Sequence, residues 1–182
     1  MSESFIDLVY RWRVRSGVIS AVLALTLADP KTAPLIAGIV LSLCGLALRA
    51  WSSGHIRKEK ELTVSGPYRF TRNPLYLGNF LIGTGIVAGC WSWWVFLVFA
   101  LYFSVFYPVV ITREKKKMQR MFPDEYQEYD HNVPLFFPRG TPASGSDKKF
   151  SWKCYAHNRE IRALAGVGLF WVLVVSKMLI MK

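Results

Sequence analysis

The sequence predicts an all-α integral membrane protein with about five transmembrane helices. Three observations support this class: the chain of 182 residues is 52% hydrophobic, 15% of its residues are aromatic, and the apolar residues gather in separate runs. This composition is untypical of a soluble domain. The basic residues, which give a net charge of +11, fall between the apolar runs. Positive charge in short loops is typical of membrane proteins, so we expect no nucleic-acid partner.

Five apolar runs are expected to form the membrane helices, and they cover residues 18–28, 34–51, 74–89, 91–111 and 161–180. The last run has the length that crosses a bilayer, about 20 residues. The very short interval between the third and fourth runs predicts a tight antiparallel hairpin. The first run could instead belong to a cleaved signal peptide, because the small residues Thr26 and Ala28 precede Asp29. A helical hairpin with the second run is the simpler interpretation.

The distribution of basic residues predicts the orientation in the membrane. Three of the 23 precede the first run, six lie in residues 49–72 and eleven in residues 113–162, whereas the opposite side has only Lys31, Lys177 and Lys182. The positive-inside rule therefore places the N-terminus and both basic segments in the cytosol. We expect a bacterial inner membrane or an endomembrane.

The chain is expected to have three parts. Residues 1–139 form a membrane core with a motif-bearing region at 54–139, residues 140–160 form a cytosolic linker rich in Gly, Pro and Ser, and residues 161–182 form an appended C-terminal transmembrane helix. The three cysteines and three histidines lie too far apart in the sequence for a disulfide framework or a metal site, so we expect neither.

The stretch from Gly66 to Asn79 changes abruptly from polar and basic to hydrophobic. Asn73 is a favoured N-cap and Pro74 suits a first helical position, so a helix is predicted to begin at Pro74. The free N–H groups at such a helix start attract anions. Charged and aromatic side chains flank this point: Tyr68, Arg69, Arg72 and Tyr76.

The fourth helix is expected to continue beyond residue 111 and to carry Glu114 out of the membrane. A short helix should follow, with Phe122, Tyr126 and Tyr129 on one face, and then an extended apolar strip at residues 133–138, which its prolines keep out of a helix. We interpret these segments as a cover on the membrane surface. Taken alone, Glu114 could simply pair with a neighbouring lysine.

Glycines recur near one face of the third predicted helix, at Gly78, Gly83, Gly85 and Gly89. Small residues at such spacing indicate close helix packing in a membrane. Alternatively, Gly78 could let a ligand lie against the backbone near the helix start. Both interpretations can hold together.

The block from Gly66 to Gly78, followed some 35 residues later by Glu114 and spaced aromatic residues, resembles the isoprenylcysteine carboxyl methyltransferase and phospholipid methyltransferase group of integral membrane enzymes. The resemblance covers residues 34–139. Asn73 stands where the carboxyl methyltransferase branch usually has His, and Lys115 stands where the second Glu of a pair is usual. The matching residues are Gly66, Pro67, Tyr68, Arg72, Asn73, Pro74, Tyr76, Gly78, Glu114, Phe122, Tyr126, Tyr129, Val133 and Pro138.

The resemblance implies S-adenosylmethionine as methyl donor, bound on the cytosolic face by the ends of the third and fourth helices and the amphipathic segment that follows. It also implies a lipid-like or prenylated acceptor, methylated on a carboxylate or an amine. Arg72 and Glu114 are the candidate catalytic residues. The candidate cofactor-binding residues are Tyr68, Arg72, Asn73, Tyr76, Leu77, Gly78, Glu114, Tyr126 and Tyr129.

The chemistry of the residues agrees with this donor. Arg72 or the helix N-terminus suits its carboxylate, Glu114 suits its ammonium, and tyrosine faces suit its sulfonium. Methyl transfer from a sulfonium needs mainly alignment and exclusion of water. A base is needed only for an amine acceptor, and the candidates are His55, Glu61 and Glu114, although His55 is more simply an interfacial histidine.

Two other functions remain open at this point. A similar helical core could belong to a membrane reductase of the sterol type that uses NADPH. Alternatively, the chain could be a non-catalytic membrane scaffold whose basic loops bind anionic lipid.

Overall fold

The computed structural model describes residues 3–57 and 61–181, and all regular structure in these residues is helical, as the sequence predicted. Of the basic residues used to predict orientation, Lys58, Lys60 and Lys182 lie outside the described residues. The elements in order are α1 (Glu3–Leu27), α2 (Thr32–Ser53), the 3-10 helix η1 (Gly66–Arg69), α3 (Pro74–Cys90), α4 (Trp93–Met121), α5 (Pro123–Asn132), α6 (Trp152–His157) and α7 (Ile161–Ile180).

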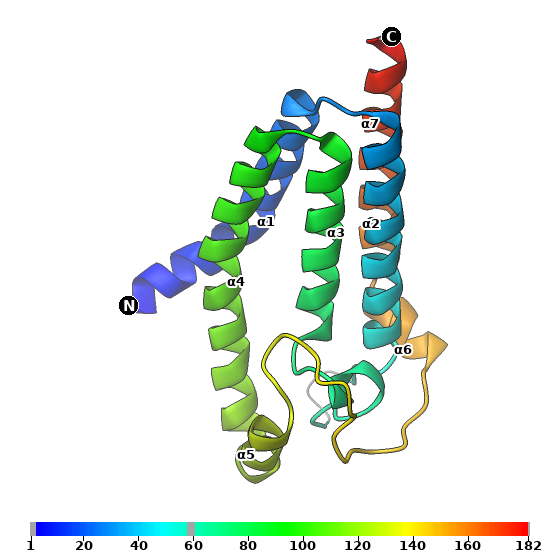
Figure 1. Ribbon diagram of the computed structural model, residues 1–182. Helices are drawn as coiled ribbons and strands as arrows, with labels where there is room; N and C mark the ends of the chain where they lie inside the picture. The colour runs from blue at the N-terminus through cyan, green and yellow to red at the C-terminus, as the bar shows by residue number, and fades with distance from the viewer. Residues whose placement is uncertain (1–2, 58–60, 182) are drawn as a thin grey trace.

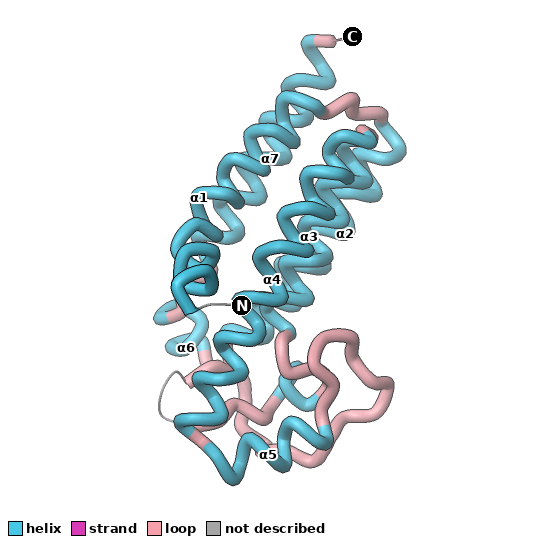
Figure 2. Tube along the Cα trace, turned by 90° about the vertical axis from the view of Figure 1, so that its left-hand side faces the viewer, coloured by secondary structure: helices cyan, strands magenta, loops and turns pink. Residues whose placement is uncertain are grey.

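The long helices form a bundle with two different ends. Helices α2, α3, α4 and α7 run along the bundle, and α1 is tilted against them (Figure 1). The segments that join α2 to α3 and α5 to α6 gather at one end beside α5, whereas the C-terminal end of α7 lies at the other (Figures 1 and 2). We call the first of these the α5 end.

Three helices among the described residues are long and apolar enough to cross a membrane: α2, α4 and α7. Their exposed side chains include many large apolar ones, such as Val40, Leu101 and Val172, which suits contact with lipid. The chain is therefore a membrane protein. Helix α3 is apolar but has 17 residues, and the N-terminal half of α1 carries three arginines. Five crossings accordingly stay a prediction.

Helices α2 and α3 pack through glycines. A Cβ built on Gly85 would lie 2.6 Å from the carbonyl oxygen of Gly38, and one built on Gly45 would lie 2.6 Å from the carbonyl oxygen of Gly78. Real Cβ atoms do not approach backbone so closely, so only glycine allows these two backbones to touch. The close packing predicted from the glycines of the third helix is confirmed.

Helix α7 contributes to the core at the end of the bundle opposite α5. Its residues Phe170, Trp171 and Val174 are buried in one cluster with residues of α1, α2, α3 and α4. Lys177 Nζ donates to the carbonyl oxygens of Leu25 at 3.0 Å and Thr26 at 2.8 Å, in the last turn of α1. These contacts satisfy carbonyls that have no partner within the helix.

The predicted linker follows the surface of the α5 end. Arg69 and Ala143 exchange two hydrogen bonds of 2.9 Å, and the amide of Ser151 donates to the carbonyl of Gly54 at 2.9 Å. Within it lies the short helix α6, which the sequence did not predict. The boundaries proposed for the three parts of the chain stay predictions.

Most predicted helix boundaries agree with the structure, with one exception at α1 and one difference in the capping of α3. Helix α1 begins at Glu3, far ahead of the apolar run at 18–28, because its arginines are good helix formers. Helix α3 begins at Pro74, as predicted, but the side chain of Asn73 does not cap it. That side chain instead donates from Nδ2 to the carbonyl of Leu135 at 2.8 Å.

Candidate active site

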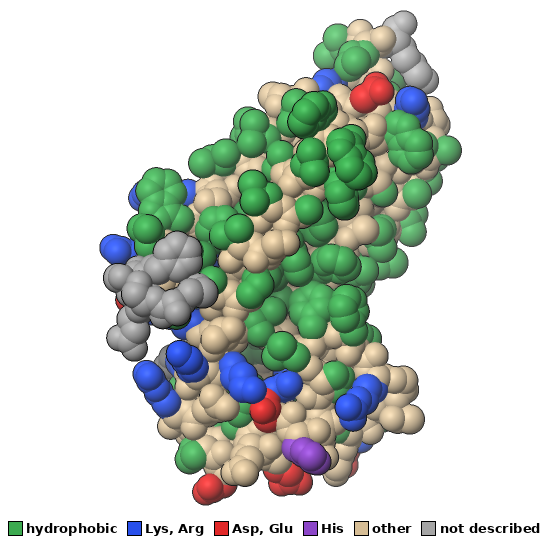
Figure 3. Space-filling model, turned by 60° about the vertical axis from the view of Figure 1, so that its left-hand side comes forward, with side chains coloured by type: hydrophobic (Ala, Val, Ile, Leu, Met, Phe, Trp, Pro, Cys, Tyr) green, Lys and Arg blue, Asp and Glu red, His purple; other side chains and the backbone are tan. Residues whose placement is uncertain are grey.

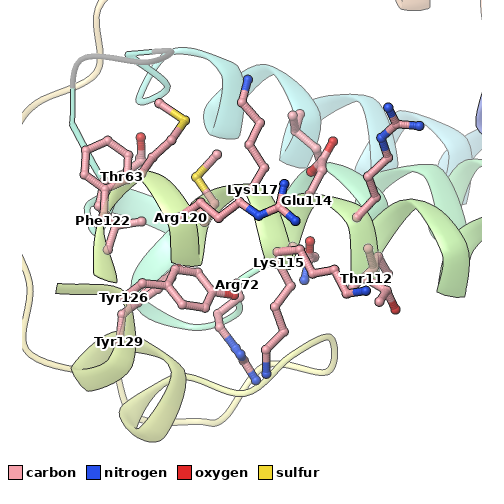
Figure 4. A pocket seen from close by; sticks show the side chains of 18 of the residues that line it. Thr63, Arg72, Thr112, Glu114, Lys115, Lys117, Arg120, Phe122, Tyr126 and Tyr129 are labelled. Atoms are coloured by element: carbon pink, nitrogen blue, oxygen red, sulfur yellow. The ribbon is translucent and has the colours of Figure 1, made fainter. Parts of the chain in front are cut away.

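A cavity of about 780 Å³ lies at the α5 end, between α1, α4, α5 and the segment that joins α2 to α3 (Figure 4). Its volume falls within the usual range for small-molecule sites, about 300–1,000 Å³. Seven of the nine predicted site residues line it: Tyr68, Arg72, Asn73, Tyr76, Glu114, Tyr126 and Tyr129. Leu77 and Gly78 are not among the lining residues, so their contact with a ligand stays a prediction.

Tyr76 and Glu114 form the central contact of the cavity. Tyr76 lies in the first turn of α3, and its hydroxyl donates to Oε1 of Glu114 on α4. A carboxylate accepts several hydrogen bonds, so this contact leaves Glu114 able to accept others. The pair connects two helices that the sequence predicted to form the site.

Two buried tyrosines support the cavity from η1 and α5. The hydroxyl of Tyr129 donates to the carbonyl of Tyr68 at 2.8 Å. Burial, reinforced by the neighbouring Tyr129 and Glu114, raises the pKa of Tyr68 well above its ordinary value, and burial also raises the pKa of Tyr129. Both phenols therefore stay neutral across the physiological range and present uncharged rings.

Arg72 has a partner that the sequence did not predict. Its guanidinium pairs with the carboxylate of Asp130 on α5, which also accepts from Lys115 Nζ at 3.0 Å. Figure 4 shows Arg72 and Lys115 extending side by side, away from Glu114. Lys115 stands where a second Glu was expected, and in this structure Asp130 supplies a carboxylate beside it.

The segment ahead of α3 is held by the strip after α5. The amide of Arg72 donates to the carbonyl of Pro134 at 2.9 Å, and the hydroxyl of Thr71 donates to the carbonyl of Phe136 at 2.7 Å. Residues 133–138 are not helical, as predicted. The strip therefore fixes the backbone from which Arg72 and Tyr76 project.

Of the three candidate bases, Glu61 and Glu114 line the cavity and His55 does not. His55 is buried, its Nδ1 lies 2.9 Å from the hydroxyl of Ser65, and its ring covers Gly66, whose φ of +56° suits glycine. Burial, with Arg57 nearby, lowers the pKa of His55. A hydrogen bond from Lys148 lowers the pKa of Glu61, which also pairs with Arg57.

Among the described residues, the cavity lining is strongly basic, with seven lysines and arginines against three carboxylates. Figure 3 shows hydrophobic side chains over the upper part of one face and basic side chains gathered below them. This arrangement suits an apolar segment in the bilayer and a polar end in the headgroup layer. The basic lining residues are Arg57, Arg72, Arg113, Lys115, Lys116, Lys117 and Arg120, and the acidic ones are Asp7, Glu61 and Glu114.

Sequence reasoning missed a buried ion pair next to the site, Arg49 with Glu160. An arginine within the apolar run at 34–51 was a usable signal, because ionisable residues at membrane depth are rare and are paired. Glu160 and Asp130 offered no comparable signal, since acidic residues in polar segments are common.

The fold and the cavity define a helical membrane protein with a basic, tyrosine-lined cavity at one end of its bundle. The chain belongs to the phospholipid methyltransferase family, whose sequence profile matches residues 33–125. The matched range contains Tyr68, Arg72, Tyr76 and Glu114, whereas α6 and α7 lie beyond it.

Two curated proteins are similar to this chain. It is 38% identical over 104 residues to the nickel-cobalt-cadmium resistance protein NccN of Alcaligenes xylosoxydans xylosoxydans. The matched region covers 56% of this chain and 47% of that protein. It is 39% identical over 107 residues to the cobalt-zinc-cadmium resistance protein CzcN of Cupriavidus metallidurans. That match covers 56% of this chain and 49% of the other protein. The chain thus spans about half the length of these relatives. No solved structure matches it.

Both relatives are named for resistance to metal ions. Within residues 3–57 and 61–181, no group of three or more His, Cys, Asp and Glu side chains is arranged to hold a metal ion. The family range and the cavity coincide instead on four residues singled out above, Tyr68, Arg72, Tyr76 and Glu114.

Proposed function

We propose that this protein transfers a methyl group from S-adenosylmethionine to a lipid or lipid-linked acceptor at the membrane surface. The observation that carries the proposal is the contact between Tyr76 and Glu114, because both residues line the cavity and both fall in the range matched by the family. A carboxylate beside tyrosine rings is the chemistry that a donor with an ammonium and a sulfonium requires.

The lining residues fit the groups of this donor. Glu114 would pair with the ammonium, and the ring of Tyr76 would face the sulfonium. The N-terminus of α3 would hold the carboxylate, because the guanidinium of Arg72 is paired with Asp130 and extends away from Glu114. The bound donor supplies a methyl group that is already activated. The residues around it therefore have to hold their partners in line and exclude water. The buried rings of Tyr126 and Tyr129 are the partners for the adenine.

The charge of the cavity favours an acceptor with an anionic headgroup. The lining residues that the structure describes carry four more positive than negative side chains, and the donor would add a further positive charge. Ile6 and Tyr10 of α1 line the same cavity as Ile111 and Thr112 of α4. The apolar part of the acceptor would enter there, between α1 and α4.

A proton acceptor is required only for one kind of substrate. A carboxylate is ionised at neutral pH, whereas an amine has to lose a proton before it can attack. For an amine acceptor, Glu114 and Glu61 are the groups in reach of the cavity. Lys148 and Arg57 already hold Glu61, whereas Glu114 accepts from Tyr76 and would also pair with the ammonium of the methyl donor, so the contacts favour neither carboxylate as the base.

We also propose that the α5 end faces the cytosol. Most basic residues of the described chain lie toward this end, whereas Lys31 and Lys177 lie at the other, and the positive-inside rule places the more basic segments in the cytosol. A cytosolic site would have direct access to S-adenosylmethionine. Cysteine labelling from the two sides of intact membranes, at Lys153 and at Lys31, tests this orientation.

The test of the function combines calorimetric binding of S-adenosylmethionine to the purified protein with radiolabelled methyl transfer into membrane lipid extracts. Glu114→Gln should weaken donor binding about 10- to 100-fold, the range for losing a hydrogen bond between charged groups. Glu128→Gln is the matched control, because Glu128 is exposed on α5 and does not line the cavity.

Three outcomes would count against the proposal. Unchanged affinity in Glu114→Gln removes the assignment of the site. A thermal-shift response to NADPH with none to S-adenosylmethionine supports a reductase. Binding of anionic lipid with no methyl incorporated into any extract supports a scaffold.

A further inference from the structure

We propose that Glu160, at the start of α7, is a positioning residue for the contact between Tyr76 and Glu114. The inference rests on the proposed function and deepens it. Helix α7 lies outside the range matched by the family. The side chains that connect Glu160, the N-cap residue of α7, to the cavity lie on three helices: Arg49 on α2, Asn79 and Tyr76 on α3, and Tyr107 and Glu114 on α4.

The first contact joins α7 to α2. Arg49 donates from Nε to Oε2 of Glu160 at 3.1 Å and from Nη2 to both carboxylate oxygens at 3.0 and 2.8 Å. Glu160 is 9% exposed and Arg49 is 16% exposed. A charged pair this deeply buried is costly to separate, because removing one partner leaves the other charge without compensation. Glu160 therefore fixes the direction of the guanidinium.

The second contact joins α2 to α3. Arg49 Nη1 donates to Oδ1 of Asn79 at 2.6 Å. The neighbouring Gly78 leaves room for the arginine, since a Cβ at that position would lie 2.6 Å from Cγ of Arg49. The glycine of the family motif thus admits Arg49 to the surface of α3. By occupying Oδ1, Arg49 also determines which way the amide of Asn79 turns.

The third contact brings the series to the site. The side chain of Asn79 lies beside the hydroxyl of Tyr107 on α4, whose ring meets the ring of Tyr76 edge-on at 5.6 Å between centroids. Tyr76 in turn donates to Glu114. The place of the Tyr76 ring is therefore set by Tyr107, that of Tyr107 by Asn79, and the orientation of Asn79 by an arginine that Glu160 holds.

Loss of this series would misplace the site without removing any residue from the cavity. Neither Arg49 nor Glu160 lines the cavity. Misplacement of a binding group by about 1 Å is enough to cost up to about 100-fold in activity. Helix α7, by this inference, completes the site from outside the family range.

The test replaces Arg49 and Glu160 together by methionine in the full-length protein. Removing a buried ion pair as a unit is often tolerated by the fold, so thermal unfolding should change little. The KM for S-adenosylmethionine should rise at least tenfold, which is within the range for a misplaced group. The ¹⁹F resonance of 3-fluorotyrosine placed at position 76 should shift and broaden, and this readout needs no activity.

Two further variants separate positioning from folding. Asn79→Asp keeps an acceptor for Arg49 but replaces the amide beside Tyr107 with a carboxylate, so it should change the resonance and the KM in the same way. Lys177→Met is the control, because Lys177 attaches α7 to α1 at the opposite end of the bundle. It should leave both readouts as in the wild type, even if it lowers the unfolding temperature.

The results that would overturn the proposal are specific. A folded double-methionine variant with wild-type KM and an unchanged resonance removes the role of the ion pair. If that variant does not fold, an unchanged resonance in Asn79→Asp removes the series of contacts. If the wild type binds no S-adenosylmethionine, the proposed function fails, while the resonance of position 76 still decides whether Glu160 positions Tyr76.

Discussion

Helix α3 packs against α2 and against α4 in opposite ways. Toward α2 it presents glycines, so the two backbones touch, as Gly85 does against Gly38. Toward α4 it presents large rings, and the centroids of Phe80 and Phe103 lie 5.0 Å apart with an edge-on arrangement. Glycine contacts leave no room between helices, whereas rings hold them apart. The cavity opens on the second side, at the α5 end.

The difference shows how one short motif serves two purposes. Tyr76 and Gly78 are two residues apart, so on a helix they face nearly opposite directions. Tyr76 points toward α4 and contacts Glu114, whereas Gly78 faces α2 and contacts Arg49. The close packing of α2 against α3 holds α3 in a fixed position. The wider spacing between α3 and α4 leaves the volume for ligands.

The largest effect is expected from adding a methyl group to the side of α3 that packs closely against α2. Gly85→Ala should lower the free energy of unfolding by about 2–3 kcal/mol, because the new Cβ meets the backbone of α2 and overpacking cannot be relieved there. Thermal or denaturant unfolding in detergent measures the change.

The matched control for this substitution is Gly168→Ala on α7. A Cβ at Gly168 has nothing within 4 Å, so the substitution should be neutral or stabilise the helix by up to about 1 kcal/mol. Equal destabilisation of the two variants would show that α2 and α3 do not touch as described.

On the spaced side, removing one hydroxyl should affect binding and spare the fold. Tyr76→Phe keeps the ring against Tyr107 but removes the donor to Glu114. We expect the affinity for S-adenosylmethionine to fall about tenfold, as for loss of one hydrogen bond to a charged group. The unfolding temperature should change little. Calorimetry measures the affinity, and Tyr155→Phe on α6 is the control. Lower stability with unchanged affinity would assign Tyr76 to packing alone.

The sequence predicted the helices and seven residues that line the cavity, because both predictions depend on local patterns. Apolar runs, Pro74 and the prolines after α5 act within a few residues, and the spacing of Tyr126 and Tyr129 placed them on one helix face. The short interval between α3 and α4 predicted a tight hairpin, and this alone was enough to place Glu114 near Tyr76.

The unpredicted contacts join residues that are distant in the chain. Arg49 and Glu160 are 111 residues apart, and Arg72 reaches Asp130 from another segment. Asn73 shows a second reason: its preference for an N-cap was overridden by the carbonyl of Leu135, 62 residues away. Local propensity cannot rank such partners, because they exist only once the bundle has formed.

A substitution at Arg120 should have a smaller effect, on the methyl acceptor but not on the methyl donor. Arg120 lines the cavity near its surface and is exposed. Arg120→Gln should raise the KM for an anionic acceptor only about two- to fivefold, because exposed charges are screened, and leave donor affinity unchanged. Kinetics at two salt concentrations measure this, with Lys153→Gln as the control. An equal effect on both substrates would remove the proposed charge selection.

The smallest expected effect is on the pH dependence of stability, and it concerns His55, which does not line the cavity. Burial and Arg57 lower the pKa of His55 below its value of about 6.5 in an unfolded chain. The unfolded state therefore binds more protons in the window below about pH 6.5, so His55 contributes stability above that pH and loses it as pH falls through its lowered pKa. Unfolding temperatures at about pH 7.5 and about pH 5.5 should differ less in His55→Gln than in the wild type. His157→Gln, on the exposed end of α6, should keep the wild-type difference. If both variants keep it, His55 is not the group that titrates, and the support of the turn at Gly66 does not depend on a neutral imidazole.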